Sequence, residues 1–156
     1  MTRRFPHKIQ EWLPHGGRML MIQAALEMED GRGVLEAVVR ESWPLCDQGQ
    51  VSAVVVIDVV AQGAAVYASW ERQNEQRPGG RGFIVGVRQT HWSAPTLPVG
   101  AVLRVEVKRE VIMDNYAAFI GEVTAQNSDF HARVELQTFR KEDQEPGPPD
   151  AALWAK

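Results

Sequence analysis

Two polar side chains stand inside an otherwise apolar stretch of the chain. Asp58 and Gln62 are the strongly polar interior residues of the run 52–70, which reads SAVVVIDVVAQGAAVYASW. An ionised carboxylate in apolar surroundings is costly, so such a residue is paired, hydrogen-bonded or protonated. Gln62 follows Asp58 by one helical turn and could donate to it. A carboxyl group held in this way can exchange a proton with a substrate, or it can be a satisfied structural acid, and both roles stay open.

The run 52–70 is expected to be a helix that is buried on every side. It is much longer than a usual strand of about 5–6 residues. It is also too interrupted to cross a bilayer, which needs roughly 20 consecutive apolar residues. Ser52 suits the helix start, because its hydroxyl can accept a free backbone N–H of the first turn. Three successive valines (54–56) are poor helix formers, so the helix requires packing around it. Residues 71–76 are expected to lead the chain out to water.

Strands are expected on both sides of this helix. Alternation of apolar and polar residues, together with turn signals, places them at residues 19–28, 33–40, 82–92, 101–113, 116–126 and 130–141. One helix with antiparallel strands is an α+β domain. Because the helix must be covered, we expect a hot-dog fold, in which a curved antiparallel β-sheet wraps around one long buried helix. Residues 1–141 are expected to form a single domain, and residues 142–156 a flexible C-terminal tail.

The composition excludes several classes of partner. The chain has 156 residues, a net charge of −3 and a single cysteine. It therefore lacks the basic footprint of a nucleic-acid-binding protein. One cysteine excludes an internal disulfide and is typical of a reducing compartment, and the N-terminus lacks the apolar core of a signal peptide. We expect a cytoplasmic protein without membrane partners. The four histidines show no zinc-type spacing, so no metal and no cofactor are expected.

Three segments carry a resemblance to a known family. They are Leu13-Pro14-His15 followed by residues 19–22, the helix motif Asp-Val-Val-Ala-Gln at 58–62, and residues 82–86 with the proline turn 95–100. Together they resemble the β-hydroxyacyl-acyl-carrier-protein dehydratases of fatty-acid synthesis. They are most similar to the dehydratase-like relatives of that family in bacterial polyene-type gene clusters. The resemblance spans residues 9–141.

The resemblance implies dehydration of a 3-hydroxyacyl thioester to a trans-2-enoyl thioester. In that family a loop histidine works with the helix carboxyl of the other subunit, beside a tunnel that holds the acyl chain. By position, Asp58 matches the catalytic carboxyl residue, and Gln62, Gly49 and Val55 are assigned to substrate binding. The implied partners are an acyl-carrier-protein or coenzyme A thioester, and a second subunit. That subunit makes a homodimer or larger homo-oligomer, or a heterodimer with a homologous dehydratase.

The loop before the helix departs from the family pattern. The family carries Gly-His-Phe-Pro there, whereas residues 44–51 read PLCDQGQV and contain no histidine. Gly49 falls near the missing histidine. His15 is the candidate substitute as a catalytic residue, although we favour the alternative of a structural histidine that hydrogen-bonds the backbone. Cys46 is either a nucleophile or, as we favour, a small buried hydrophobe. Three functions therefore remain open: a dehydratase, a hot-dog thioesterase, and a non-catalytic acyl-chain or acyl-carrier binding subunit paired with an active homologue.

Overall fold

One long helix and a strongly curved sheet make up the fold. The computed structural model describes residue 13, residues 19–76 and residues 80–142. Its elements are β1 (Ile22–Glu29), β2 (Arg32–Val38), β3 (Cys46–Asp47), β4 (Gln50–Ser52), a 3-10 turn (Ala53–Val55), α1 (Val56–Asn74), β5 (Gly80–Trp92), β6 (Thr96–Pro98), β7 (Val102–Met113), β8 (Tyr116–Ala125) and β9 (His131–Glu142). The expected α+β hot-dog class is confirmed.

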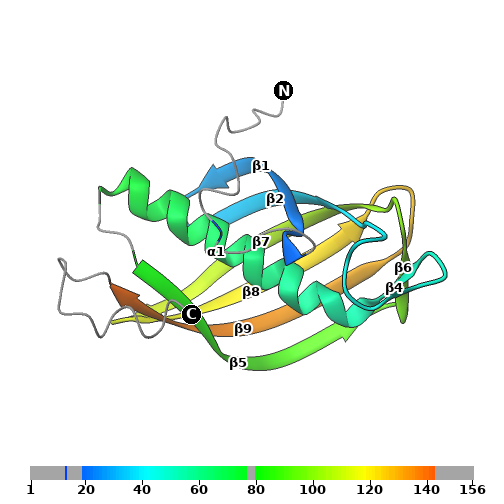
Figure 1. Cartoon of the computed structure of the whole chain (residues 1–156). Coiled ribbons are helices and arrows are strands. Elements are labelled where there is room, and N and C mark those ends of the chain that lie inside the picture. Colours follow the sequence, from blue (N-terminus) through cyan, green and yellow to red (C-terminus); the bar gives the residue numbers. More distant parts are fainter. Residues whose placement is uncertain (1–12, 14–18, 77–79, 143–156) are drawn as a thin grey trace, which may run out of the picture.

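The main sheet has six strands in the order β1-β2-β7-β8-β9-β5. All of its neighbouring pairs are antiparallel. Figure 1 shows this sheet curling around α1, with β1 and β5 as its two edges. The strands present apolar residues to the helix and polar residues to the outer face. In β9, for example, Ala132, Val134 and Leu136 are buried, while His131 and Arg133 are exposed.

A glycine allows the helix to lie directly on the sheet. An added Cβ on Gly121 of β8 would overlap the side chain of Val60 of α1. Val60 is fully buried. The absence of a side chain at residue 121 therefore sets the distance between α1 and the centre of the sheet, and it fixes how the helix is seated.

A second, small sheet was not expected from the sequence. It consists of β3, β4 and β6, in that order. Its first two strands form a hairpin whose central residues, Gln48 and Gly49, both have positive φ angles (49° and 75°), as the twist of a two-residue hairpin requires. The backbone N–H of Ala53 donates to the carbonyl of Pro95 at 2.8 Å. The start of the helix is thereby tied to the connection after β5.

The helix extends further than the sequence suggested. It ends at Asn74, and both Glu71 and Arg72 are buried, so the expectation that residues 71–76 lead into water is wrong for these two. Glu71 stays inside because it is held by partners on α1 and β7, described below. By length and composition alone, the span Ala53–Asn74 could cross a membrane, but 56% of its 18-residue apolar window is buried inside the protein, as is typical of a core helix.

Of the residues before β1, the structure describes Leu13 and residues 19–21. Leu13 is buried (6% exposed). The strand expected from residue 19 begins only at Ile22, because the backbone of residues 19–22 bonds to a side chain of α1 instead. His15 and the expected tail beyond Glu142 lie outside the described residues.

Candidate functional site

One stripe of α1 is left uncovered by the sheet. Val54 of the preceding turn is 38% exposed. One, two and three turns later along the same side come Asp58, which is exposed, and Ala61 and Ala65, which are partly exposed. The buried side of the helix packs into the core, while Ile57, Ala68 and Trp70 are half-buried and Gln73 and Asn74 at its end are exposed. This open stripe therefore combines one carboxylate with small apolar side chains, which permit close approach of another surface.

Asp58 lies on that open stripe. Its side chain is exposed, so the expectation of a carboxylate buried inside the single chain is wrong. The physical reason is the direction of its helix face, which points away from the curved sheet. In the part of the chain that the structure describes, the Asp58 carboxylate has no hydrogen-bond or ion-pair partner. It is available to a substrate or to a second chain.

Gln62 is buried and serves as a clamp between α1 and the start of β1. Its Oε1 accepts the backbone N–H of Met21 at 2.8 Å and that of Ile22 at 3.4 Å. Its Nε2 donates to the carbonyl of Met19 at 2.5 Å. The amide is thus turned to the backbone of residues 19–22 and not to Asp58, contrary to the expected pairing. These hydrogen bonds account for the burial of Gln62, which is 2% exposed, without any contact to a substrate.

Replacing Gln62 by leucine should destabilise the fold. The backbone groups of Met19 and Met21 would lose their partners inside the protein. Leaving such groups unsatisfied should lower the free energy of unfolding by about 2–4 kcal/mol. Urea denaturation of the variant measures this loss. Gln73→Leu, on an exposed position of the same helix, is the matched control and should change stability by less than about 0.5 kcal/mol. Equal stability of the two variants would show that the clamp contributes nothing.

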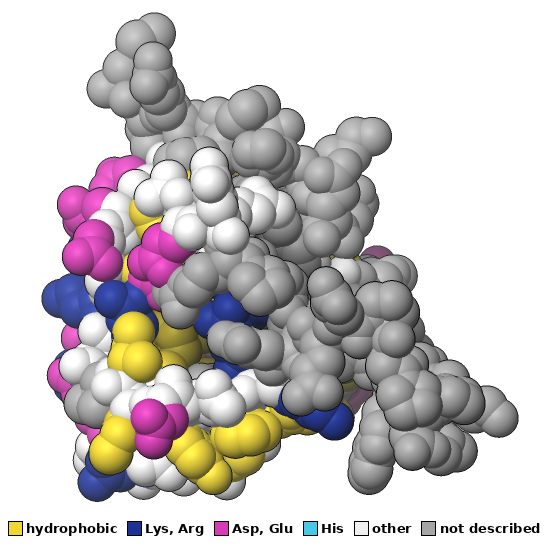
Figure 2. All heavy atoms as spheres, turned by 90° about the vertical axis from the view of Figure 1, so that its left-hand side faces the viewer, with side chains coloured by type: hydrophobic (Ala, Val, Ile, Leu, Met, Phe, Trp, Pro, Cys, Tyr) yellow, Lys and Arg dark blue, Asp and Glu magenta, His cyan; other side chains and the backbone are white. Residues whose placement is uncertain are grey.

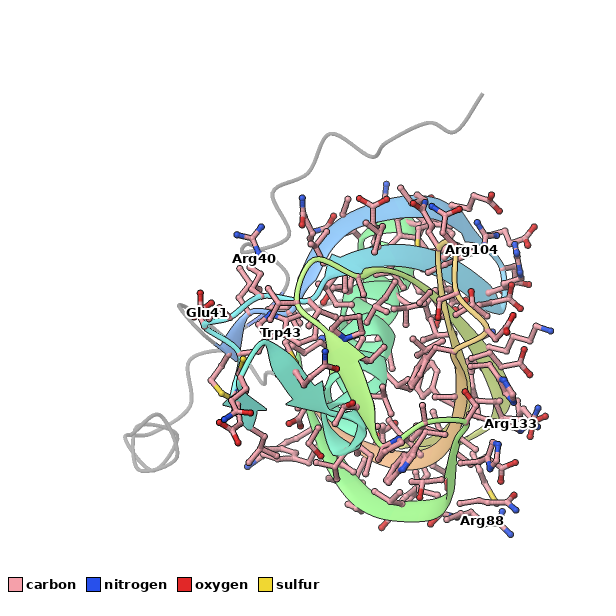
Figure 3. All side chains as sticks on the ribbon, turned by 90° about the vertical axis from the view of Figure 1, so that its right-hand side faces the viewer. Arg40, Glu41, Trp43, Arg88, Arg104 and Arg133 are labelled. Atoms are coloured by element: carbon pink, nitrogen blue, oxygen red, sulfur yellow. The ribbon has the colours of Figure 1, made fainter. Side chains whose placement is uncertain are left out.

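The loop before the helix is ordered by the small sheet. Gly49 lies exposed at the tip of the β3–β4 hairpin, and its carbonyl accepts the N–H of Val99 at 2.9 Å. Val55 is 2% exposed and belongs to the hydrophobic core. Cys46 is half-buried and packs against that core. Figure 3 shows this end of the molecule, with Trp43 and its neighbours Arg40 and Glu41 on the approach to the hairpin.

The first backbone donors of the helix are already used. The Ala53 N–H bonds to Pro95, and the N–H of Val54 donates to the hydroxyl of Ser52 at 3.4 Å. Ser52 therefore caps the 3-10 turn that leads into α1, whereas the first turn of α1 itself has no side-chain cap. A negatively charged substrate oxygen at this end would have to compete with Pro95 and Ser52 for the N–H groups of Ala53 and Val54.

The described histidines lie on the other side of the sheet from Asp58. His91 of β5 and His131 of β9 are both exposed and line a cavity with outward-facing residues of β8 and β9. The sheet stands between them and α1. Within the described part of one chain, no imidazole is placed beside Asp58. A base for acid–base chemistry at Asp58 must come from elsewhere.

A buried polar cluster at the C-terminal end of α1 was missed by sequence reasoning. The Tyr67 hydroxyl accepts the N–H of Gly31 at 2.6 Å and donates to Glu71 Oε2 at 2.9 Å. Burial raises the pKa of Tyr67 above its usual value, which keeps this donor protonated. Arg109 of β7 forms an ion pair with Glu71. Figure 2 faces this end of the molecule, where basic and acidic side chains lie beside apolar ones.

This cluster is a structural feature that spans three elements. It joins α1, the β1–β2 turn and β7, and Arg109 also reaches Asp30 at 3.4 Å. Arg109 and Glu71 are separated in sequence by β5 and β6. The spacing of the two residues along the chain therefore does not predict this ion pair. A charged residue at the end of an apolar helix is only a weak indication of one.

The curved antiparallel sheet around one core helix defines a hot-dog protein. A family model described as ApeP dehydratase matches residues 7–146. The chain therefore belongs to the ApeP-like dehydratase family. No curated protein matches the sequence significantly.

Solved structures share the fold. The dehydratase heterocomplex ApeI:P from Xenorhabdus doucetiae superposes with a TM-score of 0.76 at 18% identity, covering 95% of this chain and 97% of that one. A hypothetical thioesterase with coenzyme A from Streptococcus pneumoniae gives a TM-score of 0.55 at 15% identity, with 78% and 87% covered. A Streptococcus mutans protein bound to acetyl coenzyme A gives a TM-score of 0.60 at 12% identity, with 85% and 98% covered.

Proposed function

We propose that this chain is one subunit of a 3-hydroxyacyl-thioester dehydratase whose reacting site forms between two chains. Asp58 would be the acid contributed by this chain, and an imidazole of a homologous, histidine-bearing subunit would be the base. The observation that carries the proposal is the position of Asp58, exposed on a helix stripe and separated by the sheet from His91 and His131. Membership of the ApeP-like dehydratase family supports the reaction type.

The proposed chemistry needs one base and one acid. The imidazole takes a proton from the carbon beside the thioester carbonyl, and the carbonyl oxygen becomes an enolate. The enolate collapses to the conjugated double bond and expels the 3-hydroxyl group. Asp58 protonates this group, so that it leaves as water. The carboxylate then recovers a proton from the imidazolium or from water, and both groups return to their starting states.

The edge strand β5 is the proposed contact with the second subunit. Among the described residues it has a sheet neighbour, β9, on one side only. Its apolar side chains Phe83, Ile84, Val85 and Val87 are 47%, 46%, 54% and 45% exposed. Successive strand residues point to opposite faces, so both faces of this edge are apolar and uncovered. A homologous edge strand would pair with its free backbone groups and bury these side chains.

Lysine at residue 85 should prevent this assembly. A charge on an edge strand blocks strand pairing, because pairing would bury it. In sedimentation velocity, the wild-type chain mixed with its homologous partner should run as a two-chain species, and Val85→Lys as separate chains. Ile112→Lys is the matched control, since Ile112 is 54% exposed but lies on β7. Assembly of Val85→Lys as complete as that of the control would place the interface elsewhere.

The products of the reaction test the proposed function. The assembled protein is given a 3-hydroxyacyl thioester on an acyl carrier protein or on coenzyme A, and the products are separated by mass spectrometry. A dehydratase yields the enoyl thioester and water with the thioester intact, whereas a thioesterase releases free thiol. Loss of water without thiol release is expected. Release of thiol as the main product, or substrate bound and returned unchanged, would overturn the proposal.

His15 remains the candidate base within this chain. Because it lies outside the described residues, its role is tested by substitution. In the mixed assembly, His15→Ala should retain most of the turnover if the second subunit supplies the imidazole. A loss comparable with that of an Asp58 variant would assign the base to His15 instead.

A further inference from the structure

Two histidines that are far apart in sequence meet on the outer face of the sheet. His91 lies near the end of β5, and His131 is the first residue of β9. Their ring centroids are 5.5 Å apart, with an angle of 40° between the ring planes. Both side chains are exposed, so they are open to solutes. Neither takes part in the chemistry proposed above.

The spacing of the two rings suits a shared metal ion. A Zn–N bond of about 2.0–2.1 Å puts the ion roughly 3.2 Å from the centroid of an imidazole, so two imidazoles at a tetrahedral angle have centroids about 5 Å apart. The observed separation is close to this value. Imidazole nitrogens are ligands for zinc, copper and nickel. The rings therefore need little movement to bind one ion.

The backbone of His131 is fixed by hydrogen bonds, and one of its ring nitrogens lies near a carbonyl oxygen. Its backbone N–H donates to the Ser93 hydroxyl at 3.0 Å, and its carbonyl accepts the N–H of Ser93 at 2.9 Å. Its Nδ1 lies 3.4 Å from the carbonyl of Asp129. A proton on Nδ1 directed to that carbonyl leaves the Nε2 lone pair for a metal, which is how metal-binding histidines are commonly oriented.

The surroundings do not repel a cation strongly. Arg133, the register partner of His91, is the basic side chain that lines this cavity. Its guanidinium donates to Glu122 at 2.9 Å and to Glu135 at 3.5 Å, so its charge is balanced. Figure 3 shows Arg133 on the outer side of the sheet, directed away from α1. Glu122 and Thr124 line the same cavity of about 490 Å³ as the two histidines.

We propose that His91 and His131 form a binding site for one divalent transition-metal ion of the class that includes zinc, copper and nickel. In the described part of the chain, no group of three His, Cys, Asp or Glu side chains comes together for a metal. The two imidazoles are thus the protein ligands, and water completes the coordination. The ion would join β5 to β9 next to the free edge of the sheet. This inference is independent of the proposed function.

The test uses the full chain without an affinity tag. Calorimetric titration with zinc chloride should give one saturable site per chain. His91→Gln and His131→Gln should each weaken zinc binding by roughly 10–100-fold or more. Loss of a residue that only hydrogen-bonds to a metal ligand already lowers metal affinity by about this factor, and loss of the ligand itself should lower it at least as much. The double variant His7→Gln/His15→Gln is the matched control and should bind as the wild type does. Zinc should also raise the melting temperature of the wild type and of this control only.

A second readout needs no variant. Electron paramagnetic resonance of the wild-type chain with one equivalent of copper(II) should show coupling to two imidazole nitrogens. The proposal is overturned if zinc does not saturate the wild type, if either single variant binds as the wild type does, or if copper couples to fewer than two imidazoles. Circular dichroism of the exposed single-site variants confirms that their fold is retained.

Discussion

Asp58→Asn should lower the turnover of the assembled dehydratase by roughly 10²–10⁴-fold, the usual contribution of acid–base catalysis. Asparagine keeps the shape of the side chain but has no proton to give to the leaving hydroxyl group. The fold should be unaffected, because Asp58 is exposed and has no partner among the described residues of its own chain. Steady-state turnover of a 3-hydroxyacyl thioester by the variant and wild-type assemblies measures the effect.

The control for Asp58 is a second exposed aspartate. Asp114 lies in the β7–β8 turn with a φ of 54°, a conformation that asparagine also tolerates. Asp114→Asn should therefore leave both turnover and stability unchanged. If Asp58→Asn matches this control in turnover, the carboxyl group is not the catalytic acid, and the chain acts as a binding subunit.

Arg109→Met should lower the free energy of unfolding by about 3–5 kcal/mol, because it removes the arginine that forms an ion pair with the buried carboxylate of Glu71. Glu71 is only 10% exposed at its side chain, and Arg109 17%. Methionine replaces the length of the arginine stem but not its charge. The Tyr67 hydroxyl would remain as a donor to Glu71, but a neutral hydrogen bond does not replace an ion pair. Chemical denaturation gives the loss.

Lys108→Met is the matched control for Arg109. Lys108 is the preceding residue on β7, with a side chain that is 55% exposed and paired with Glu106 on the surface. Its loss should cost less than about 1 kcal/mol. Adding Glu71→Gln to Arg109→Met should recover part of the stability, since the buried charge is then removed. Equal stabilities of Arg109→Met and Lys108→Met would mean that the cluster is not a stabilising one.

Most of the fold could be predicted because its signals are periodic. Alternation located the six long strands, and the apolar run located the helix that they surround. The strands β3, β4 and β6 could not be predicted, since each has only two or three residues, too few to show a period. The burial of Glu71 was missed because its partner, Arg109, comes from a strand that is distant in sequence.

The candidate site was predicted less completely. Asp58 was found because a carboxylate in an apolar run is unusual, yet the run does not reveal which helix face the sheet leaves open. Gln62 was paired with Asp58 on helical spacing alone, whereas its amide is bound by the backbone of residues 19–22. The meeting of His91 with His131 depends on β5 and β9 being neighbours, which is a property of the sheet order and not of spacing.

The most direct test of the shared reacting site is turnover as a function of subunit ratio. This chain and a homologous, histidine-bearing dehydratase are mixed at constant total concentration with a 3-hydroxyacyl thioester, and enoyl thioester formation is followed. If Asp58 and the imidazole come from different chains, each protein alone should be nearly inactive and the rate should peak at equal amounts. A rate that rises in simple proportion to either protein, with no maximum in the mixture, would contradict a site formed between the two chains.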